Sequence, residues 1–180
     1  MFNLTKFFVV AALGLLGQAS FAQTEPAAAP APTDPQIAHI VVTANTIDVD
    51  AGKLAQKESK NKEIRDFAKL MVTDHMAVNK QATTLAKKLK VTPEDNETSK
   101  ALKKGAEENV ANLKKLKGAD FDKAYADHEV AYHQQVLDAI DKALIPNAKN
   151  AELKALLEKT RPAIAAHLEH AKKVQLALNK

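Results

Sequence analysis

Cysteine is absent from this chain of 180 residues, and its absence excludes several kinds of site. Without thiols the protein has no disulfide, no thiolate metal ligand and no cysteine for lipid attachment. Glycine is scarce, with 5 residues, which argues against a β-sandwich with many tight turns. Tryptophan is absent and aromatic residues make up 4% of the chain. Alanine, leucine, lysine and glutamate dominate instead, and these residues favour helices.

The chain also lacks a strong excess of charge of one sign. It has 26 lysine and arginine residues against 22 acidic ones, a formal net charge of +4, and its basic residues are dispersed. Nucleic-acid-binding domains usually concentrate basic residues on one face, often with interleaved aromatics. We therefore expect no nucleic-acid partner. The length suits a single domain with a real hydrophobic core.

Long apolar runs are confined to the N-terminus, where residues 1–22 predict a cleavable signal peptide. Lys6 supplies the positive charge, residues 7–16 form the apolar core, and Ser20 and Ala22 are the small residues that precede cleavage. The core is short for a membrane span, and no later segment approaches eighteen consecutive apolar residues. We therefore expect no transmembrane span in the mature chain and a soluble protein in the periplasm, or a secreted one.

Helical periodicity dominates the rest of the sequence. Residues 23–34 predict a flexible linker rich in proline and alanine, and residues 35–180 predict one helical domain. The expected helices span about 35–58, 62–90, 93–117, 121–144 and 150–178. Capping patterns predict N-caps at Asp34, Thr92 and Asp120, a C-cap at Gly118, a loop at 145–150 and a kink at Pro162. Four long amphipathic helices and one shorter helix predict an all-α four-helix bundle with one additional helix.

Five ionisable residues lie within or beside the apolar stripes of these helices. Because an α-helix turns about 100° per residue, each position can be placed relative to its stripe. The residues predicted to face the interior are Asp48, His75, Glu129, His133 and His167. His128 lies off the stripe and is expected to face solvent or a groove. Neutral buried histidines also predict that acid destabilises the fold.

Two interpretations of these inward residues stay open. Imidazole and carboxylate groups are ordinary ligands for zinc, iron or manganese, and the interior of a helical bundle can hold such an ion. Alternatively, the buried groups form only a polar network in the core, as in a stress-related interaction or structural module of the periplasm. The sequence does not determine whether the five residues lie at the same height in the bundle.

Four stretches resemble domain-of-unknown-function family 4142, often described as "predicted outer membrane protein". They are ANTIDVDAGKLA at 44–55, IRDFAKLMVTDH at 64–75, FDKAY at 121–125 followed by His133, and RPAIAAHLEHA at 161–171. The resemblance covers about residues 36–178 and implies a ferritin-like helical bundle in an exported protein. The histidines that match the family pattern are His75, His133 and His167, and Asp48 stands where the pattern often has glutamate.

The resemblance implies no agreed activity, and catalytic motifs are missing from the sequence. Di-iron bundles use a glutamate three residues before the ligand histidine, but the corresponding residues here are Val72, Val130 and Ile164. We therefore expect neither a standard di-iron centre nor oxidase chemistry. There is no cysteine nucleophile, no phosphate-binding glycine loop and no nucleophile elbow. A homo-oligomer and a protein partner both remain open.

Overall fold

The computed structural model describes residues 31–179, and this part of the chain is helical without any strand. The predicted signal peptide, and the linker up to residue 30, lie outside the described residues. The elements are α1 (Asp34–Glu58), α2 (Lys62–Lys88), α3 (Glu97–Leu113), α4 (Gly118–Ala139), the π-helical turn η1 (Ile140–Leu144), α5 (Ile145–Asn147) and α6 (Ala151–Leu178). No helix within residues 31–179 is long and apolar enough to cross a membrane.

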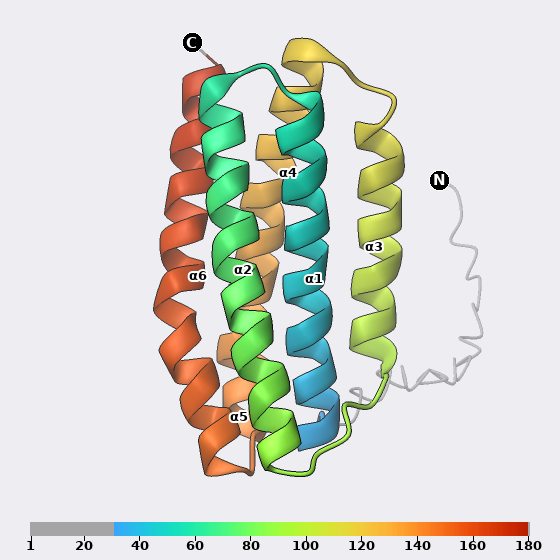
Figure 1. Cartoon of the computed structure of the whole chain (residues 1–180), viewed down its shortest axis with the longest axis vertical. Helices are drawn as coiled ribbons and strands as arrows, with labels where there is room; N and C mark the ends of the chain where they lie inside the picture. Colours follow the sequence, from blue (N-terminus) through green and yellow to red (C-terminus); the bar gives the residue numbers. More distant parts are fainter. Residues whose placement is uncertain (1–30, 180) are drawn as a thin grey trace, which may run out of the picture. The chain divides into compact units, whose positions relative to one another are not determined.

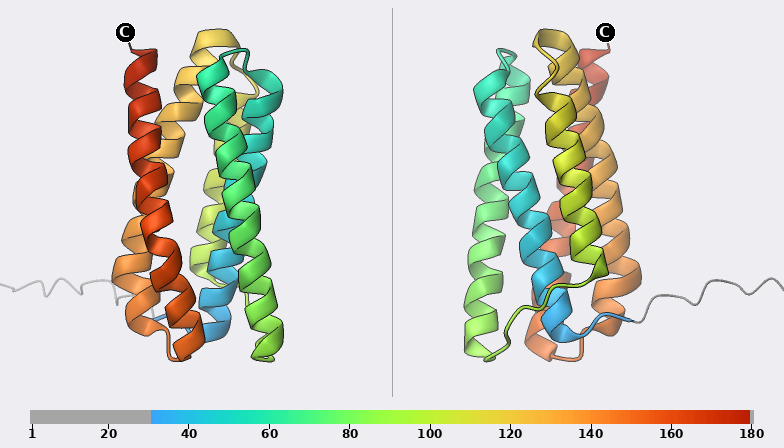
Figure 2. Two further views of the ribbon diagram at one scale, coloured as in Figure 1. Left: turned by 60° about the vertical axis from the view of Figure 1, so that its left-hand side comes forward. Right: turned by 90° about the vertical axis from the view of Figure 1, so that its right-hand side faces the viewer.

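The four long helices form the bundle, and the shorter α3 packs beside it. Helix α1 packs on α2, α4 packs on α6, and α2 also contacts α6 (Figure 1). Helix α3 lies on the outside of α1 and α4 (Figure 2), where it buries only Ser99, Leu102 and Leu113. The predicted all-α bundle of four long helices and one shorter helix is confirmed.

Apolar residues form two core clusters, one toward each end of the bundle. One cluster includes Phe67, Met71 and Tyr125, and the other includes Ile40, Ile140 and Ile164, among others. On each long helix at least one buried polar residue lies where the two clusters adjoin: Asp48 on α1, His75 on α2, Glu129 and His133 on α4, and His167 on α6. Because these residues contact one another, the core has a buried polar layer between its apolar halves.

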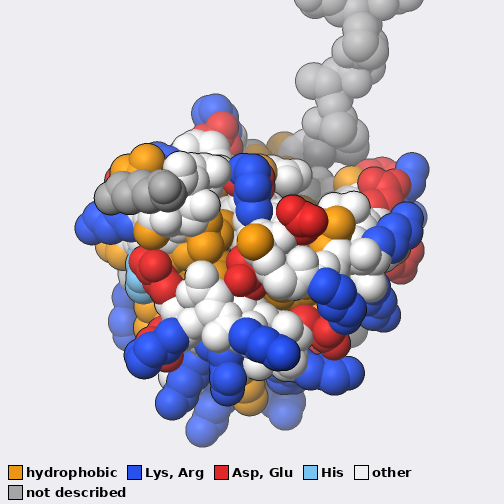
Figure 3. Space-filling view, turned by 90° about the horizontal axis from the view of Figure 1, so that it is seen from above, with side chains coloured by type: hydrophobic (Ala, Val, Ile, Leu, Met, Phe, Trp, Pro, Cys, Tyr) orange, Lys and Arg blue, Asp and Glu red, His pale blue; other side chains and the backbone are white. Residues whose placement is uncertain are grey.

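Charged side chains cover the outside of the helices. Lys62 pairs with Asp66, and Lys123 pairs with Asp127, each one helical turn apart on an exposed face. The end of the bundle seen in Figure 3 carries lysine and arginine side chains with acidic ones between them. This mixture agrees with solvated helix faces rather than with one extended basic surface.

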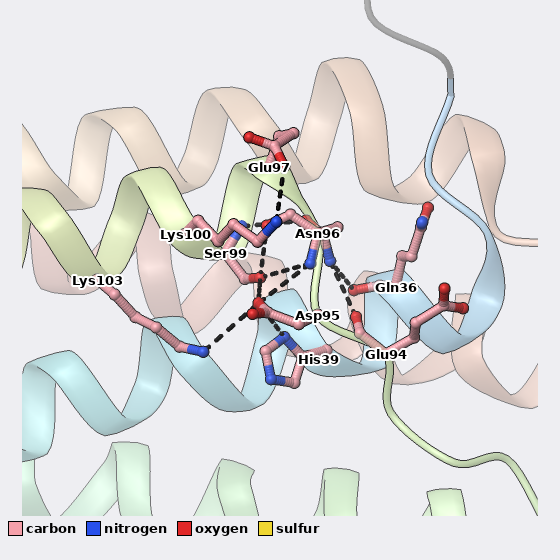
Figure 4. Close-up of polar contacts among 9 residues, drawn as sticks. All are labelled: Gln36, His39, Glu94, Asp95, Asn96, Glu97, Ser99, Lys100 and Lys103. Atoms are coloured by element: carbon pink, nitrogen blue, oxygen red, sulfur yellow. Dashed lines mark hydrogen bonds and ion pairs between the residues drawn. The ribbon is translucent and has the colours of Figure 1, made fainter.

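Helix α3 begins four residues later than its sequence predicted. Asn96, rather than Thr92, is the N-cap: its side chain accepts from the Ser99 amide at 3.0 Å, and Ser99 Oγ accepts from the Asn96 amide at 3.0 Å (Figure 4). The preceding loop is held on α1, because the Glu94 amide donates to the Pro35 carbonyl at 3.1 Å. This reciprocal cap and the contact with α1 outweigh the local Thr-Pro start signal.

Other predicted helix boundaries also differ from the structure. Helix α1 is capped by Thr33, while the Asp34 carboxylate accepts from the backbone amides of Lys149 and Asn150. Helix α4 begins at Gly118, which has φ +57°. Gly118 therefore starts α4 instead of capping the end of α3, and Asp120 lies within the first turn of α4 instead of capping it.

Pro146 lies in the predicted loop at 145–150 and Pro162 at the predicted kink, and both lie within helical backbone. The chain stays helical through Asn147, because Pro146 occupies the first turn of α5, where a proline needs no amide partner. Helix α6 is continuous across Pro162. The predicted loop at 145–150 is therefore limited to its last three residues.

Gly52 permits the close approach of α1 to α2. A Cβ atom at this position would lie 2.9 Å from the Ala68 carbonyl oxygen and 2.9 Å from Val72 Cγ2. We expect Gly52→Ala to push the two helices apart and lower the free energy of unfolding by about 1–3 kcal/mol. Urea denaturation of the variant and the wild type measures the difference.

Gly105 in α3 provides the matched control, because a Cβ atom there would meet nothing within 4 Å. Gly105→Ala keeps the helix-propensity gain without the clash, so it should stabilise the protein by up to about 1 kcal/mol. If both substitutions change stability by the same amount and in the same direction, the helix contact at Gly52 does not limit packing.

Candidate metal centre

The five inward-facing residues come from the four long helices and are all buried. Asp48 on α1, His75 on α2, Glu129 and His133 on α4, and His167 on α6 expose between 0% and 5% of their surface. Their predicted inward orientation is confirmed. His128, expected to face solvent or a groove, is half-buried, and its ring stacks on Tyr132 with centroids 5.5 Å apart.

Three of the buried residues are histidines whose rings surround a common point. The ring centroids of His75 and His167 are 5.2 Å apart, and that of His133 lies 5.6 Å from each of them. One ring nitrogen of each histidine lies within 4.8 Å of a ring nitrogen of the other two. Small side-chain rotations would therefore bring three nitrogens to one ion, since zinc–nitrogen bonds are about 2.0–2.1 Å long.

Asn45 determines which nitrogen of His75 carries the proton. The Asn45 side-chain amide donates to the Val41 carbonyl at 2.7 Å, which orients its oxygen toward His75 Nδ1, also at 2.7 Å. An amide oxygen only accepts hydrogen bonds, so His75 Nδ1 is the donor. The lone pair of His75 is consequently on Nε2.

The other two histidines are oriented in the same way by oxygen acceptors. His133 Nδ1 donates to the Glu129 backbone carbonyl at 2.9 Å, and His167 Nε2 donates to the Asp74 carboxylate at 3.0 Å. The remaining nitrogens, His75 Nε2, His133 Nε2 and His167 Nδ1, are buried and have no hydrogen-bond partner among the described residues. Metal-binding histidines characteristically donate their outer N–H to an oxygen in this manner.

Two carboxyl groups complete the cluster. Asp48 Oδ2 lies 3.5 Å from His75 Nε2, and Glu129 Oε2 lies 3.4 Å from His133 Nδ1. Asp48, Glu129 and His133 can also bring one ligand atom each within 4.8 Å of the others. Asp48 Oδ1 and both Glu129 oxygens are without a hydrogen-bond partner in the described part of the chain. His133 thus belongs to both groups of three residues.

Burial changes the protonation of this cluster. It lowers the pKa of His75 to about 3 and that of His133 to about 4, with repulsion from the neighbouring histidines as a further cause. Burial also raises the pKa of Asp48 to about 8 and the pKa of Glu129 well above its usual range, where the Asp48 charge adds to the effect. At neutral pH these two histidines are therefore uncharged, and the carboxyl pair retains protons.

The outer partners Asn45 and Asp74 were not among the sequence-predicted site residues. Asn45 is buried three residues before Asp48, so both lie on the same side of α1. Two polar residues three positions apart beside an apolar stripe were the sequence signal that could have identified Asn45. Asp74 precedes His75 on α2 but reaches His167 on α6, a contact that no spacing along the chain indicates.

Comparisons with known proteins agree with the helical fold. The family model described as "Domain of unknown function (DUF4142)" matches residues 19–174. The solved structure "CopM in the Cu(II)-bound form" is 14% identical, superimposes with a TM-score of 0.63, and covers 81% of this chain and 98% of its own. At this identity the likeness concerns the fold alone. No curated protein matches the chain.

Proposed function

The chain belongs to the DUF4142 family, whose description assigns no function, and we infer its function from its residues. We propose that the protein binds one divalent transition-metal ion. His75, His133 and His167 would supply the nitrogen ligands. The observation that carries the proposal is the meeting of three buried histidine rings, each with one unpartnered nitrogen and with its opposite N–H group donating to an oxygen. Buried polar atoms without partners are costly, and an ion would satisfy all three.

The donor set favours Cu(II) and Zn(II) among the divalent metals. Imidazole nitrogens suit copper, zinc, iron and nickel, whereas manganese prefers oxygen ligands. At a site of this type Cu(II) binds more tightly than Zn(II). The structurally similar CopM was solved with Cu(II) bound, which supports copper as the first metal to test.

Asp48 and Glu129 would balance the charge of the ion. Asp48 is the carboxyl group nearest to His75 Nε2 and is the natural fourth ligand, while Glu129 lies beside His133. A bound cation favours the ionised form of both groups, so metal uptake would release protons. Two carboxylates and a divalent ion leave the buried cluster without net charge.

We further propose that this is a periplasmic metal-binding protein rather than an enzyme. The predicted signal peptide at residues 1–22 would direct the export of the chain, and the domain would act in solution. A ferritin-like relationship is part of this proposal, because the ligands come from all four long helices of the bundle. A di-iron site would need glutamate three residues before each ligand histidine. The residues at these positions are Val72, Val130 and Ile164, which argues against di-iron chemistry.

The proposal is tested by metal binding to the untagged mature chain. After chelator treatment, dialysis against Cu(II) or Zn(II) followed by elemental analysis should find about one equivalent per chain. At a free metal concentration a thousandfold above Kd, the ion should raise the free energy of unfolding by about 4 kcal/mol.

His170→Ala is the matched control, because His170 is exposed and lies three residues after His167 on α6. It should bind the same amount of metal as the wild type. Less than about a tenth of an equivalent in both proteins would overturn the proposal. The buried histidines would then form only a polar network in the core, as expected for a structural or interaction module.

A further inference from the structure

An apolar cavity of about 80 Å³ adjoins the histidine cluster. Its wall includes Ile40 on α1, Val136 on α4, Ile140 on η1 and Leu157 on α6. At its polar side are Asn45, Asp48 and His75, and His75 contacts both of the others, so the three form one patch. The cavity therefore extends from the cluster into the apolar half of the core.

The composition of the wall determines which molecules the cavity can hold. A buried water molecule needs two to four polar partners, which the patch of Asn45, Asp48 and His75 offers at one side of the cavity only. The aliphatic part offers none, and a space lined by aliphatic side chains remains dry and can take up xenon or benzene. The hydroxyl of Thr160, another wall residue, donates its proton to the Leu156 carbonyl, so it has no proton left to donate to a ligand. A hydrated ion would have to lose its water shell against this wall, which is unfavourable.

We propose that this cavity binds a small uncharged apolar molecule of a few heavy atoms, about the size of xenon or dioxygen, directly beside His75 and Asp48. The binding itself does not require a metal. The consequence for a bound metal ion rests on the proposed function. Such a molecule would lie next to the ion, on the side opposite to the bundle end that contains Phe67.

The wall also includes exposed residues through which such a molecule can enter. Thr98 on α3 and Gln135 on α4 line the cavity and are themselves exposed to solvent. Leu102 is the buried α3 residue on this side. Because α3 buries so few side chains, small movements of this helix can open the route without unfolding the four-helix bundle.

The π-helical turn η1 forms part of the cavity wall. Ile140 and Leu144 point into the apolar cluster, and both line the cavity. On the outside of the same turn, Asp141 accepts two hydrogen bonds from Arg161 on α6, at 2.6 and 2.7 Å. Single π-helical turns recur at functional sites, and this ion pair holds the turn against α6.

Xenon is the probe for the first experiment, with ¹²⁹Xe NMR of the metal-free mature chain. We expect a saturable xenon shift in the wild type. Ile40→Phe should fill the cavity and abolish the shift, whereas Leu157→Ala should enlarge it, strengthen xenon binding severalfold and admit benzene. Leu176→Ala, the same substitution at an exposed position of α6, should leave xenon binding unchanged.

Loading the protein with Cu(II) then tests the position of the bound molecule. Because Cu(II) is paramagnetic, it should accelerate the relaxation of xenon severalfold in the wild type and in Leu157→Ala. The absence of a saturable shift in both proteins would overturn the cavity proposal, even if Ile40→Phe fails to fold. Unchanged relaxation in protein shown by elemental analysis to hold copper would overturn the placement beside the ion. Failure of copper to bind, with the xenon shift retained, would overturn the metal proposal alone.

Discussion

Metal affinity is expected to fall by about a hundredfold or more when His133 or His75 is replaced with alanine. Each histidine supplies one of three convergent nitrogens, and no neighbouring described side chain offers another nitrogen at the same point. Loss of an outer partner alone costs about 10–100-fold in affinity, so loss of a ligand should cost at least the upper value. Competition titration against a chelating dye measures the affinity, and circular dichroism verifies that each variant folds.

Asn45→Ala provides a graded comparison in the same titration. Asn45 does not face the ion, but it holds His75 in the tautomer that presents Nε2. Its removal should weaken binding by about 10–100-fold, between the ligand variants and the unchanged His170→Ala control. Metal retained at wild-type affinity by both His75→Ala and His133→Ala would place the ion elsewhere and contradict the three-histidine site.

The metal-free protein is expected to lose stability as the pH rises from 6.5 to 8. Asp48 keeps its proton in the folded protein up to a pKa of about 8, but releases it near pH 4 in the unfolded chain. The folded state therefore binds more protons than the unfolded state over this range, and stability falls as pH rises. Asp48 alone should account for about 2 kcal/mol between pH 6.5 and 8. The raised pKa of Glu129 acts in the same direction.

The buried histidines act with the opposite sign below pH 6.5. His75 and His133 stay neutral in the folded protein down to pKa values of about 3 and 4, while both become protonated near pH 6.5 in the unfolded chain. Acid therefore stabilises the unfolded state through these histidines, as the sequence predicted. The carboxyl groups of Asp48 and Glu129 offset the effect of the two histidines between about pH 4.5 and 6.5. The free energy of unfolding of the wild type should therefore change little over this range. The sequence-based expectation of simple acid destabilisation omitted these protonated carboxyls.

Asp48→Asn combined with Glu129→Gln separates the two effects. These substitutions imitate the protonated carboxyl groups and remove their titration. The double variant should lose its sensitivity between pH 6.5 and 8, and should lose about 3 kcal/mol between pH 6.5 and 5 through His75 and His133. Urea unfolding at pH 5, 6.5 and 8 in the presence of a chelator gives the comparison. A wild type that is equally stable at pH 6.5 and 8 would show that the carboxyl pair is ionised.

Local patterns in the sequence determined the helices and the direction in which each side chain faces. The period of an α-helix and the apolar stripes were sufficient to assign α1, α2 and α6 nearly to the residue, and to turn Asp48, His75, Glu129, His133 and His167 inward. Both results depend on residues within a few turns of one another, which is the range over which helix geometry acts. Where a contact from another element intervenes, as at Asn96 against α1, the local pattern failed to locate the helix start.

Only the tertiary structure decided that the inward residues meet. Periodicity sets the angle of a side chain around its own helix, but the height at which two helices pack depends on their connections and on close contacts such as Gly52 against α2. That register brings His75, His133 and His167 to one level between two apolar clusters. It also supplies Asn45 and Asp74, which orient two of the three rings, and leaves the cavity beside His75. These features depend on contacts between residues 30 to 93 positions apart, which no spacing within a single helix encodes.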